Sequence, residues 1–472
     1  DGLGRADEAE PLFRRAADAG HHEAMCSLGV LLDGLGRADE AEPLYRQAVA
    51  AGDVDAMFHL GLLLDGLGRA DEAEPLFRRA ADAGHHEAMC SLGVLLDGLG
   101  RADEAEPLYR QAVAAGDVDA MFHLGLLLDG LGRADEAEPL FRRAADAGHH
   151  EAMCSLGVLL AKSGRADEAE ASFRQAVAAG VVSAMFHLGL LLDGLGRADE
   201  AEPLFRRAAD AGHHEAMCSL GVLLAEAGRA DEAEPLYRQA VAAGDVDAMF
   251  NLGLLLDGLG RADEAEPLFR RAADAGHHEA MCSLGVLLAE AGRADEAEPL
   301  YRQAVAAGDV DAMFNLGLLL DGLGRADEAE PLFRRAADAG HHEAMCSLGV
   351  LLAEAGRADE AEPLFRRAAD AGHHEAMCNL GVLLAKSGLM DEAEPWFCRA
   401  ADAGHPNALF NLGVLLAKAG RRGDAEAAFL QAADAGHPAA IFNLGVLLAA
   451  AGRTDEAENF FRRAANAGYP VP

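Results

Sequence analysis

The chain opens with two segments whose apolar residues are spaced as in amphipathic helices. Residues 6–19 read ADEAEPLFRRAADA, and residues 22–32 read HEAMCSLGVLL. Apolar residues at i, i+3, i+4 and i+7 predict one buried stripe per helix. Short loops make neighbouring helices antiparallel, so the predicted fold class is all-α. The predicted core residues are Ala9, Leu12, Phe13, Ala16 and Ala17 in the first segment and Ala24, Met25, Leu28, Leu31 and Leu32 in the second.

Local signals agree with these two helices. Asp7 and Glu10 have the spacing of a capping box, and Glu10 with Arg14 forms an i,i+4 pair in the favourable orientation. Gly29 lies in the middle of the second helix, where glycine costs about 1 kcal/mol relative to alanine. Because this glycine recurs in every unit, we expect a close approach of two helices there.

The whole pattern recurs along the chain as a 32-residue unit. The phrase GRADEAEPL begins at Gly4, Gly36 and Gly68, and fourteen full units with a 24-residue remainder fill the 472 residues. A period of this length predicts a solenoid of stacked helical hairpins, here with about 29 helices, that winds into a superhelix. We expect residues 1–384 to form near-identical repeats and residues 385–472 to form divergent repeats and a cap, since Trp396, Pro406 and Ile441 appear there.

The charge balance restricts the class of partner. The net charge is −39, and the only lysines are Lys162, Lys386 and Lys418. Phosphate backbones and anionic membranes require clustered cations, so nucleic-acid and membrane partners are disfavoured. A basic or neutral protein or peptide fits best, because long-range attraction would steer it to the chain.

The eight cysteines do not indicate a disulfide framework. Six of them recur in every second unit, from Cys26 to Cys346. Equivalent positions two units apart should be separated by roughly 20 Å, whereas bridged Cα atoms lie within about 7 Å. Free thiols favour a reducing compartment, and we expect a cytoplasmic location. The chain starts inside a unit and without Met, which is typical of a fragment.

These residues resemble the tetratricopeptide-repeat superfamily. The stretch AADAGHHEAMCSLGVLL is similar to its Sel-one-like branch. The units are shorter than the usual length of about 34 residues, and the paired cysteines of a disulfide-stapled branch are missing. The resemblance implies a right-handed superhelix, a scaffold or adaptor role, and a concave groove faced by Glu23, Cys26 and Val30. The signature residues are Leu28, Gly29, Gly36, Ala41, Tyr45 and Ala48.

A second periodicity, two units long, alternates two unit types along this groove. Cys26 of one type corresponds to Phe58 of the other. The phenylalanines either contact a partner or only compensate the smaller cysteines in packing, and both interpretations stay open. The candidate partner-binding residues are Phe58, Phe122, Phe186, Phe250 and Phe314, together with the acids Glu87, Asp119 and Glu151.

Metal binding and catalysis are weaker hypotheses. HHEAMC occurs seven times, and His22 and Cys26 share a helix face with Met25 nearby. Two ligands fall short of the usual three or four, so we expect a solvated histidine pair, a buried thiol, no metal and no cofactor. A catalytic dyad would need one distinguished copy with an orienting group. We therefore expect no enzymatic activity.

Three functions remain after these exclusions. The leading one is a protein-interaction scaffold that binds a basic or neutral, partly apolar segment in a concave acidic groove. The clamp that such repeats use for acidic peptide tails is disfavoured, because the groove positions carry Glu, Cys, Phe and Val. The alternatives are a trigger-sensing arm of a larger bacterial signalling or defence ATPase, and self-association into a structural filament.

Overall fold

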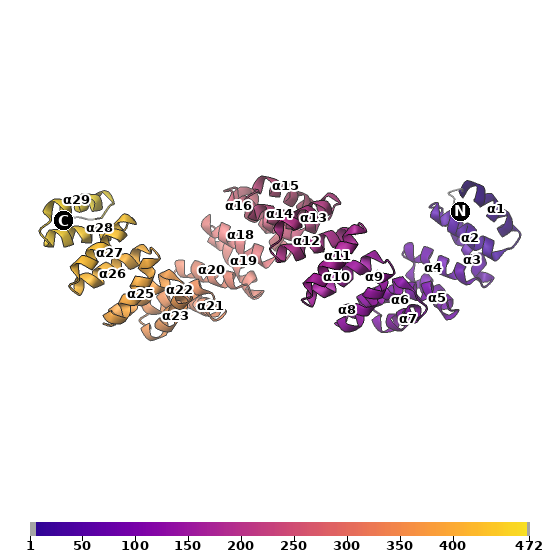
Figure 1. The fold of residues 1–472 in the computed structure, drawn as a ribbon, viewed down its shortest axis with the longest axis horizontal. Helices are drawn as coiled ribbons and strands as arrows, with labels where there is room; N and C mark the ends of the chain where they lie inside the picture. The colour runs from indigo at the N-terminus through magenta and orange to yellow at the C-terminus, as the bar shows by residue number, and fades with distance from the viewer. Residues whose placement is uncertain (1–5, 470–472) are drawn as a thin grey trace. The chain divides into compact units, whose positions relative to one another are not determined.

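The computed structural model describes residues 6–469, and this part of the chain contains 29 α-helices and no β-strand. Figure 1 shows the helices paired along the chain. Even-numbered helices begin with HEAMCSLG-like or VDAMFHLG-like segments and are called A helices; odd-numbered helices are called B helices. The all-α class and the helix-pair solenoid are thereby confirmed, while the right-handed superhelix stays a prediction.

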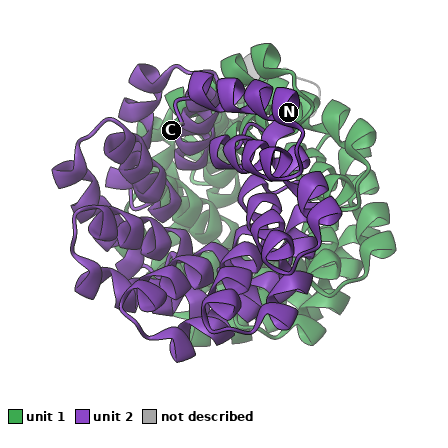
Figure 2. Ribbon diagram, turned by 90° about the vertical axis from the view of Figure 1, so that its left-hand side faces the viewer, with its two compact units in different colours: residues 1–245 green, residues 246–472 purple. Residues whose placement is uncertain are grey.

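Contacts divide the chain into two compact units, Asp1–Asp245 and Val246–Pro472, which Figure 2 colours separately. The predicted division at residue 384 refers to sequence divergence and stays a prediction. In unit 1 the A helices are α2 (His22–Gly34), α4 (Val54–Gly66), α6 (His86–Gly98), α8 (Val118–Gly130), α10 (His150–Lys162), α12 (Val182–Gly194) and α14 (His214–Glu226). Its B helices are α1 (Ala6–Asp18), α3 (Ala38–Ala50), α5 (Ala70–Asp82), α7 (Ala102–Ala114), α9 (Ala134–Asp146), α11 (Ala166–Ala178), α13 (Ala198–Asp210) and α15 (Ala230–Ala242).

Unit 2 repeats the same scheme. Its A helices are α16 (Val246–Gly258), α18 (His278–Glu290), α20 (Val310–Gly322), α22 (His342–Glu354), α24 (His374–Lys386), α26 (Pro406–Lys418) and α28 (Pro438–Ala450). Its B helices are α17 (Ala262–Asp274), α19 (Ala294–Ala306), α21 (Ala326–Asp338), α23 (Ala358–Asp370), α25 (Met390–Asp402), α27 (Arg422–Asp434) and α29 (Thr454–Asn466).

Each helix packs against the next one along its unit, and consecutive A helices also contact each other, as α2 does α4 and α6 does α8. A glycine in the left-handed region ends each helix. After α2, Gly36 has a φ of 75°, its N–H donates to the carbonyl of Asp33 at 2.8 Å, and the N–H of Arg37 donates to the carbonyl of Leu32 at 2.8 Å. This is a Schellman motif, in which glycine accepts the positive φ without strain.

The glycine inside each A helix allows the close approach predicted from the sequence. A Cβ atom on Gly29 would lie 2.5 Å from Cε1 of Tyr45, and one on Gly61 would lie 2.5 Å from Cε1 of Phe77. The rings of Tyr45 and Phe77 are buried against these glycines. The predicted core holds elsewhere in the repeats, but Leu12 is 65% exposed, because no described helix precedes α1.

The predicted capping box is wrong. The side chain of Asp7 lies outside the described residues, but its equivalent Asp39 lies inside α3, whose N-cap is Arg37 with no side-chain cap. The carboxylate that was expected to complete the box binds arginine instead. The A helices are the capped ones: Asp53 Oδ1 accepts the N–H of Ala56 at 2.9 Å.

Arginine and glutamate side chains join consecutive B helices in closed rings of four. Glu10 pairs with Arg14 at 2.8 Å, as predicted, and with Arg37 at 2.8 Å; Glu40 pairs with the same two arginines at 3.3 Å and 2.8 Å. The ring recurs along unit 1, for example at Glu74, Arg78, Arg101 and Glu104. It is partly solvent-exposed, so each pair contributes modestly to stability.

Candidate partner-binding face

The exposed surface of the A helices carries the predicted groove positions, and we call it the A-face of each unit. In unit 1 it presents one exposed aliphatic side chain on most A helices. Exposed fractions are 40% for Val30 and 43% for Leu190. Single exposed apolar residues are ordinary, but here they recur at one position of α2, α4, α6, α8 and α12. The set is Val30, Leu62, Val94, Leu126 and Leu190.

The five predicted phenylalanines occupy equivalent positions one turn before this aliphatic residue, three in unit 1 and two in unit 2. All are half-buried: Phe58, Phe122, Phe186, Phe250 and Phe314. Phe58 contacts His85 with tilted rings whose centroids are 4.6 Å apart, and its centroid lies 6.3 Å from that of Phe77. Each ring therefore packs within the fold and keeps an exposed part, and its role in binding stays a prediction.

The histidine that each phenylalanine meets is the N-cap of the next A helix. His85 Nδ1 accepts the N–H of Ala88 at 3.2 Å, so the neutral ring carries its proton on Nε2, 3.6 Å from Asp55 Oδ1. The His85 side chain is only 15% exposed, whereas its neighbour His86 is 45% exposed. The expected solvated pair is therefore one solvated and one structural histidine.

This contact gives the alternation of the two unit types a structural cause. At one junction the large pair Phe58 and His85 fills the space between consecutive A helices. At the next junction, a small cysteine lies opposite an N-cap aspartate, Asp117. The Nδ1 atom of His86 lies 3.2 Å from Oδ2 of this aspartate. Large and small pairs alternate, so the phenylalanine is matched to the following N-cap histidine.

The predicted acids project from the A-face. Side-chain exposure is 53% for Glu87, 74% for Asp119 and 67% for Glu151. Asp119 and Glu151 converge on His149, each at 3.5 Å, while Glu87 lies 3.2 Å from His85. Within residues 6–469 no arginine pairs with the carboxylates of the A helices, because the paired arginines lie between B helices. The A-face is therefore acidic.

Buried groups of the A helices have shifted pKa values. Burial raises the pKa of the Cys90 thiol to about 12, so this cysteine is an inert, protonated packing group. Burial also lowers the pKa of His59, whose ring stacks on Tyr45. All eight cysteines are free, as predicted. In the part of the chain that the structure describes, no three His, Cys, Asp or Glu side chains are grouped to hold a metal ion.

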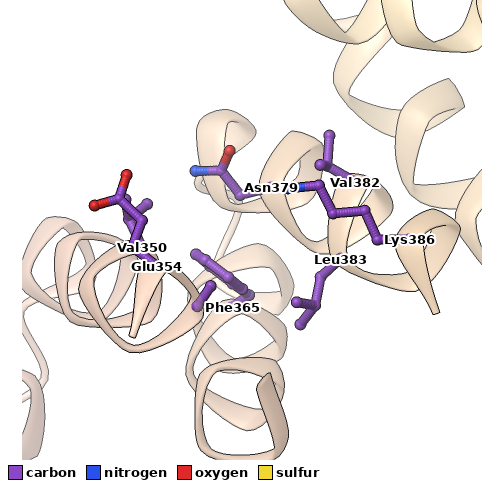
Figure 3. A pocket seen from close by; sticks show the side chains of 8 residues that line it. Val350, Glu354, Phe365, Asn379, Val382, Leu383 and Lys386 are labelled. Carbon is purple, nitrogen blue, oxygen red and sulfur yellow. The ribbon is translucent and has the colours of Figure 1, made fainter. Parts of the chain in front are cut away.

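Three hollows open along the A-face of unit 2, and Phe314 is the one predicted partner-binding residue among those that line them. The first, of about 330 Å³, is lined by Phe314 and Cys346. The second, of about 190 Å³, has Glu354 on one side and Lys386 on the other, with Phe365 between them (Figure 3). The third, of about 240 Å³, lies between α24 and α26 and is lined by Lys386, Asn411 and Lys418. The scarcity of lysine was the only sequence signal for these positions.

The repeat pattern and this architecture match a known family model, described as Tetratricopeptide repeat. The matched segments are residues 2–53, 28–88, 90–152, 154–216, 218–280, 282–344, 346–408 and 410–470. The chain belongs to the tetratricopeptide repeat family. Proteins built from such repeats are generally scaffolds that mediate protein interactions and not enzymes. No curated protein sequence matches the chain.

Solved structures with this fold include Sel-one-like repeat proteins. A protective antigen of uropathogenic Escherichia coli, c5321, with this repeat fold aligns at a TM-score of 0.60 and 23% identity over 84% of this chain and 96% of its own. A Sel1 repeat protein from Oxalobacter formigenes aligns at a TM-score of 0.41 and 27% identity over 46% of this chain and 98% of its own. The first likeness supports the tetratricopeptide-type solenoid.

None of the helices within residues 6–469 is both long enough and apolar enough to span a membrane.

Proposed function

We propose that this tetratricopeptide repeat protein is a non-enzymatic scaffold whose A-faces bind a basic or neutral, partly apolar protein segment. The observation that carries the proposal is the row of exposed aliphatic side chains in unit 1, from Val30 to Leu190, beside carboxylates that no arginine neutralises. An extended segment would place apolar side chains on this row and cationic ones beside Glu87, Asp119 and Glu151. The exposed parts of Phe58, Phe122 and Phe186 would widen the apolar contact.

Electrostatics supports a cationic partner. The net charge of −39 raises the local concentration of cationic segments and speeds their association. Such attraction is screened over about 8–10 Å at physiological salt, so binding should weaken as salt is added. Buried free thiols favour a reducing compartment such as the cytoplasm as the place of action.

The test is fluorescence anisotropy with three labelled peptides that share one apolar pattern. Their remaining positions carry only Lys and Arg in the basic peptide, only Glu in the acidic peptide, and uncharged residues in the neutral peptide. We expect the basic peptide to bind, the acidic one not to bind, and affinity to fall between about 50 mM and about 500 mM NaCl. The variant Glu87→Gln, Asp119→Asn, Glu151→Gln should lower affinity about threefold to tenfold, because several rim charges are removed.

The matched control removes three exposed charges from the B helices, Asp18→Asn, Asp82→Asn and Asp146→Asn. It should bind like the parent chain, since these exposed side chains belong to B helices and not to the A helices. Equal losses in the two triple variants would mean that net charge alone attracts the peptide. Preference of the parent for the acidic peptide would overturn the proposal.

A further inference from the structure

The charge of the A-face changes sign along unit 2. Two carboxylates lie on each of the first four A helices. On α24 one carboxylate is balanced by Lys386, and α26 carries Lys418 with no acid, while α28 has no charged side chain. Among residues 6–469 neither Lys386 nor Lys418 has an ion-pair partner. The acids of the first four helices are Asp247 and Asp257, Glu279 and Glu290, Asp311 and Asp321, and Glu343 and Glu354.

The alternation of large and small pairs breaks at the same place. Phe314 contacts His341 with ring centroids 4.6 Å apart, but the next two junctions pair a small cysteine with a histidine N-cap: Cys346 with His373, and Cys378 with His405. The large pair returns only at Phe410 and His437, with ring centroids 4.6 Å apart. At the first of these junctions the space beside Cys346 and His373 is open, where a phenylalanine ring lies at the other histidine junctions.

The three hollows lie among α20 to α26, and only one of them is lined by a cysteine and an N-cap histidine. The first is lined by Cys346 and His373, and its apolar wall is formed by Phe314, Leu318 and Val350. The second and third share Val382 and Lys386 on opposite sides of α24. Asparagines line the second and third hollows. Asn379 Nδ2 donates to Cys346 Sγ at 3.5 Å, which leaves the Asn379 carbonyl oxygen for another donor. Each hollow thus combines an apolar wall with polar groups at the rim.

Because the change of charge and the hollows occur on the same helices, we propose that α20 to α26 form a specificity site. Its ligand is a peptide segment whose own charge changes sign along its length. A basic residue of the segment lies beside Glu343 and Glu354, apolar side chains enter the hollows, and a carboxylate lies between Lys386 and Lys418. The proposal rests on the scaffold function proposed above and adds the order of charges to it.

The spacing of the helices sets the spacing of the two charges. Neighbouring helices pack about 8–10 Å apart and an extended chain rises about 3.3 Å per residue, so one to two helix spacings correspond to about three to six residues. The segment therefore has a Lys or Arg and, about three to six residues away, an Asp or Glu, with aliphatic or aromatic residues between them. Reversing the order would place like charges together at both ends.

The experiment measures anisotropy of the full chain with three labelled peptides that share one apolar core: basic at one end and acidic at the other, basic at both ends, and acidic at both ends. We expect the mixed peptide to bind about fivefold or more tightly than the doubly basic one, as two additional rim pairs would give. Equal affinities of the mixed and doubly basic peptides would overturn the charge order while leaving the scaffold function intact. Failure of all three to bind would overturn both.

Two variants locate the site. Lys386→Glu with Lys418→Glu should abolish the preference for the mixed peptide and leave binding of the doubly basic one intact or stronger. The matched control is Lys162→Glu, the same change in unit 1, which should keep the preference. A preference that survives the double reversal, or that Lys162→Glu also removes, contradicts the placement.

A third variant tests the hollows. Cys346→Phe places a phenylalanine opposite His373, like the pair of Phe314 and His341 at the preceding junction. The chain should therefore remain helical with an unchanged melting temperature, while the mixed peptide binds several-fold more weakly. Cys346→Ser, which keeps the volume open, should bind like the parent. Full binding by a folded Cys346→Phe chain would exclude the hollow at Cys346 from the site.

Discussion

The glycine inside each A helix decides how closely the next B helix approaches. At Gly93 a Cβ atom would lie 2.6 Å from Cε1 of Tyr109, and the Tyr109 ring is buried. Gly98, near the end of the same helix, has no atom within 4 Å of an added Cβ. The same residue type therefore has opposite consequences at two positions of one helix.

Gly93→Ala should destabilise its junction. The ring must shift, and overpacking of this kind costs about 1–3 kcal/mol, which outweighs the gain of about 1 kcal/mol from better helix propensity. Gly98→Ala is the matched control and should be neutral or stabilising. Hydrogen–deuterium exchange of residues 86–114 measures both; slower exchange in Gly93→Ala would contradict the packing argument.

Among the elements, the phenylalanine-bearing A helices of unit 1 each carry a pH-sensitive histidine. Burial lowers the pKa values of His59, His123 and His187, while the same position carries Asn251 and Asn315 in unit 2. A histidine whose folded pKa is lowered stays neutral in the fold and binds protons on unfolding. Its stabilising contribution is complete above the unfolded value near 6.5 and decreases as the pH falls below it.

Unit 1 should therefore lose stability as the pH falls below about 6.5. The triple variant His59→Asn, His123→Asn, His187→Asn copies unit 2 and should remove this loss. A second loss should remain below about pH 4.5, since hydrogen bonds from Arg101 and then Arg78 lower the pKa of Glu104 to about 2. Urea unfolding followed by circular dichroism at several pH values measures both; an unchanged acid profile in the triple variant would contradict the assignment.

For the whole molecule, each unit is a sum of nearly identical junctions. A B-helix ring such as Arg101 with Glu74 and Glu104 and the glycine–tyrosine contact recur along unit 1, and every repeat contacts only its neighbours. In such arrays each added repeat adds one interface, so the free energy of unfolding increases by a similar amount with every repeat.

Fragments of unit 1 with two, four and six repeats should therefore unfold at rising urea concentrations, with nearly constant increments in free energy. Circular dichroism of equimolar fragments measures the series. A two-repeat fragment as stable as the six-repeat one would show that the junctions do not carry the stability.

The single-repeat and double-repeat periodicities were sufficient to predict the helices, their pairing and the close helix approach at Gly29, because these features depend on residues close in sequence. The pairing of Arg37 with Glu10 was not predictable from a local capping rule, because Glu10 lies on the preceding B helix. The N-cap role of His85 was hidden by an adjacent identical residue. The hollows beside Lys386 required knowledge of which side chains share a face, since Phe365 and Lys386 are distant in sequence.

The matching of Phe58 to His85 also bears on how the array changes during evolution. A duplication or deletion of one double repeat joins compatible ends, so a gene can lengthen or shorten in double repeats without disturbing any junction. A change of one single repeat instead creates a mismatch such as Cys346 beside His373. Unequal recombination at this locus would thus have two outcomes. Gain or loss of a double repeat changes only the length of the array, whereas gain or loss of a single repeat opens a new cavity on which selection can act.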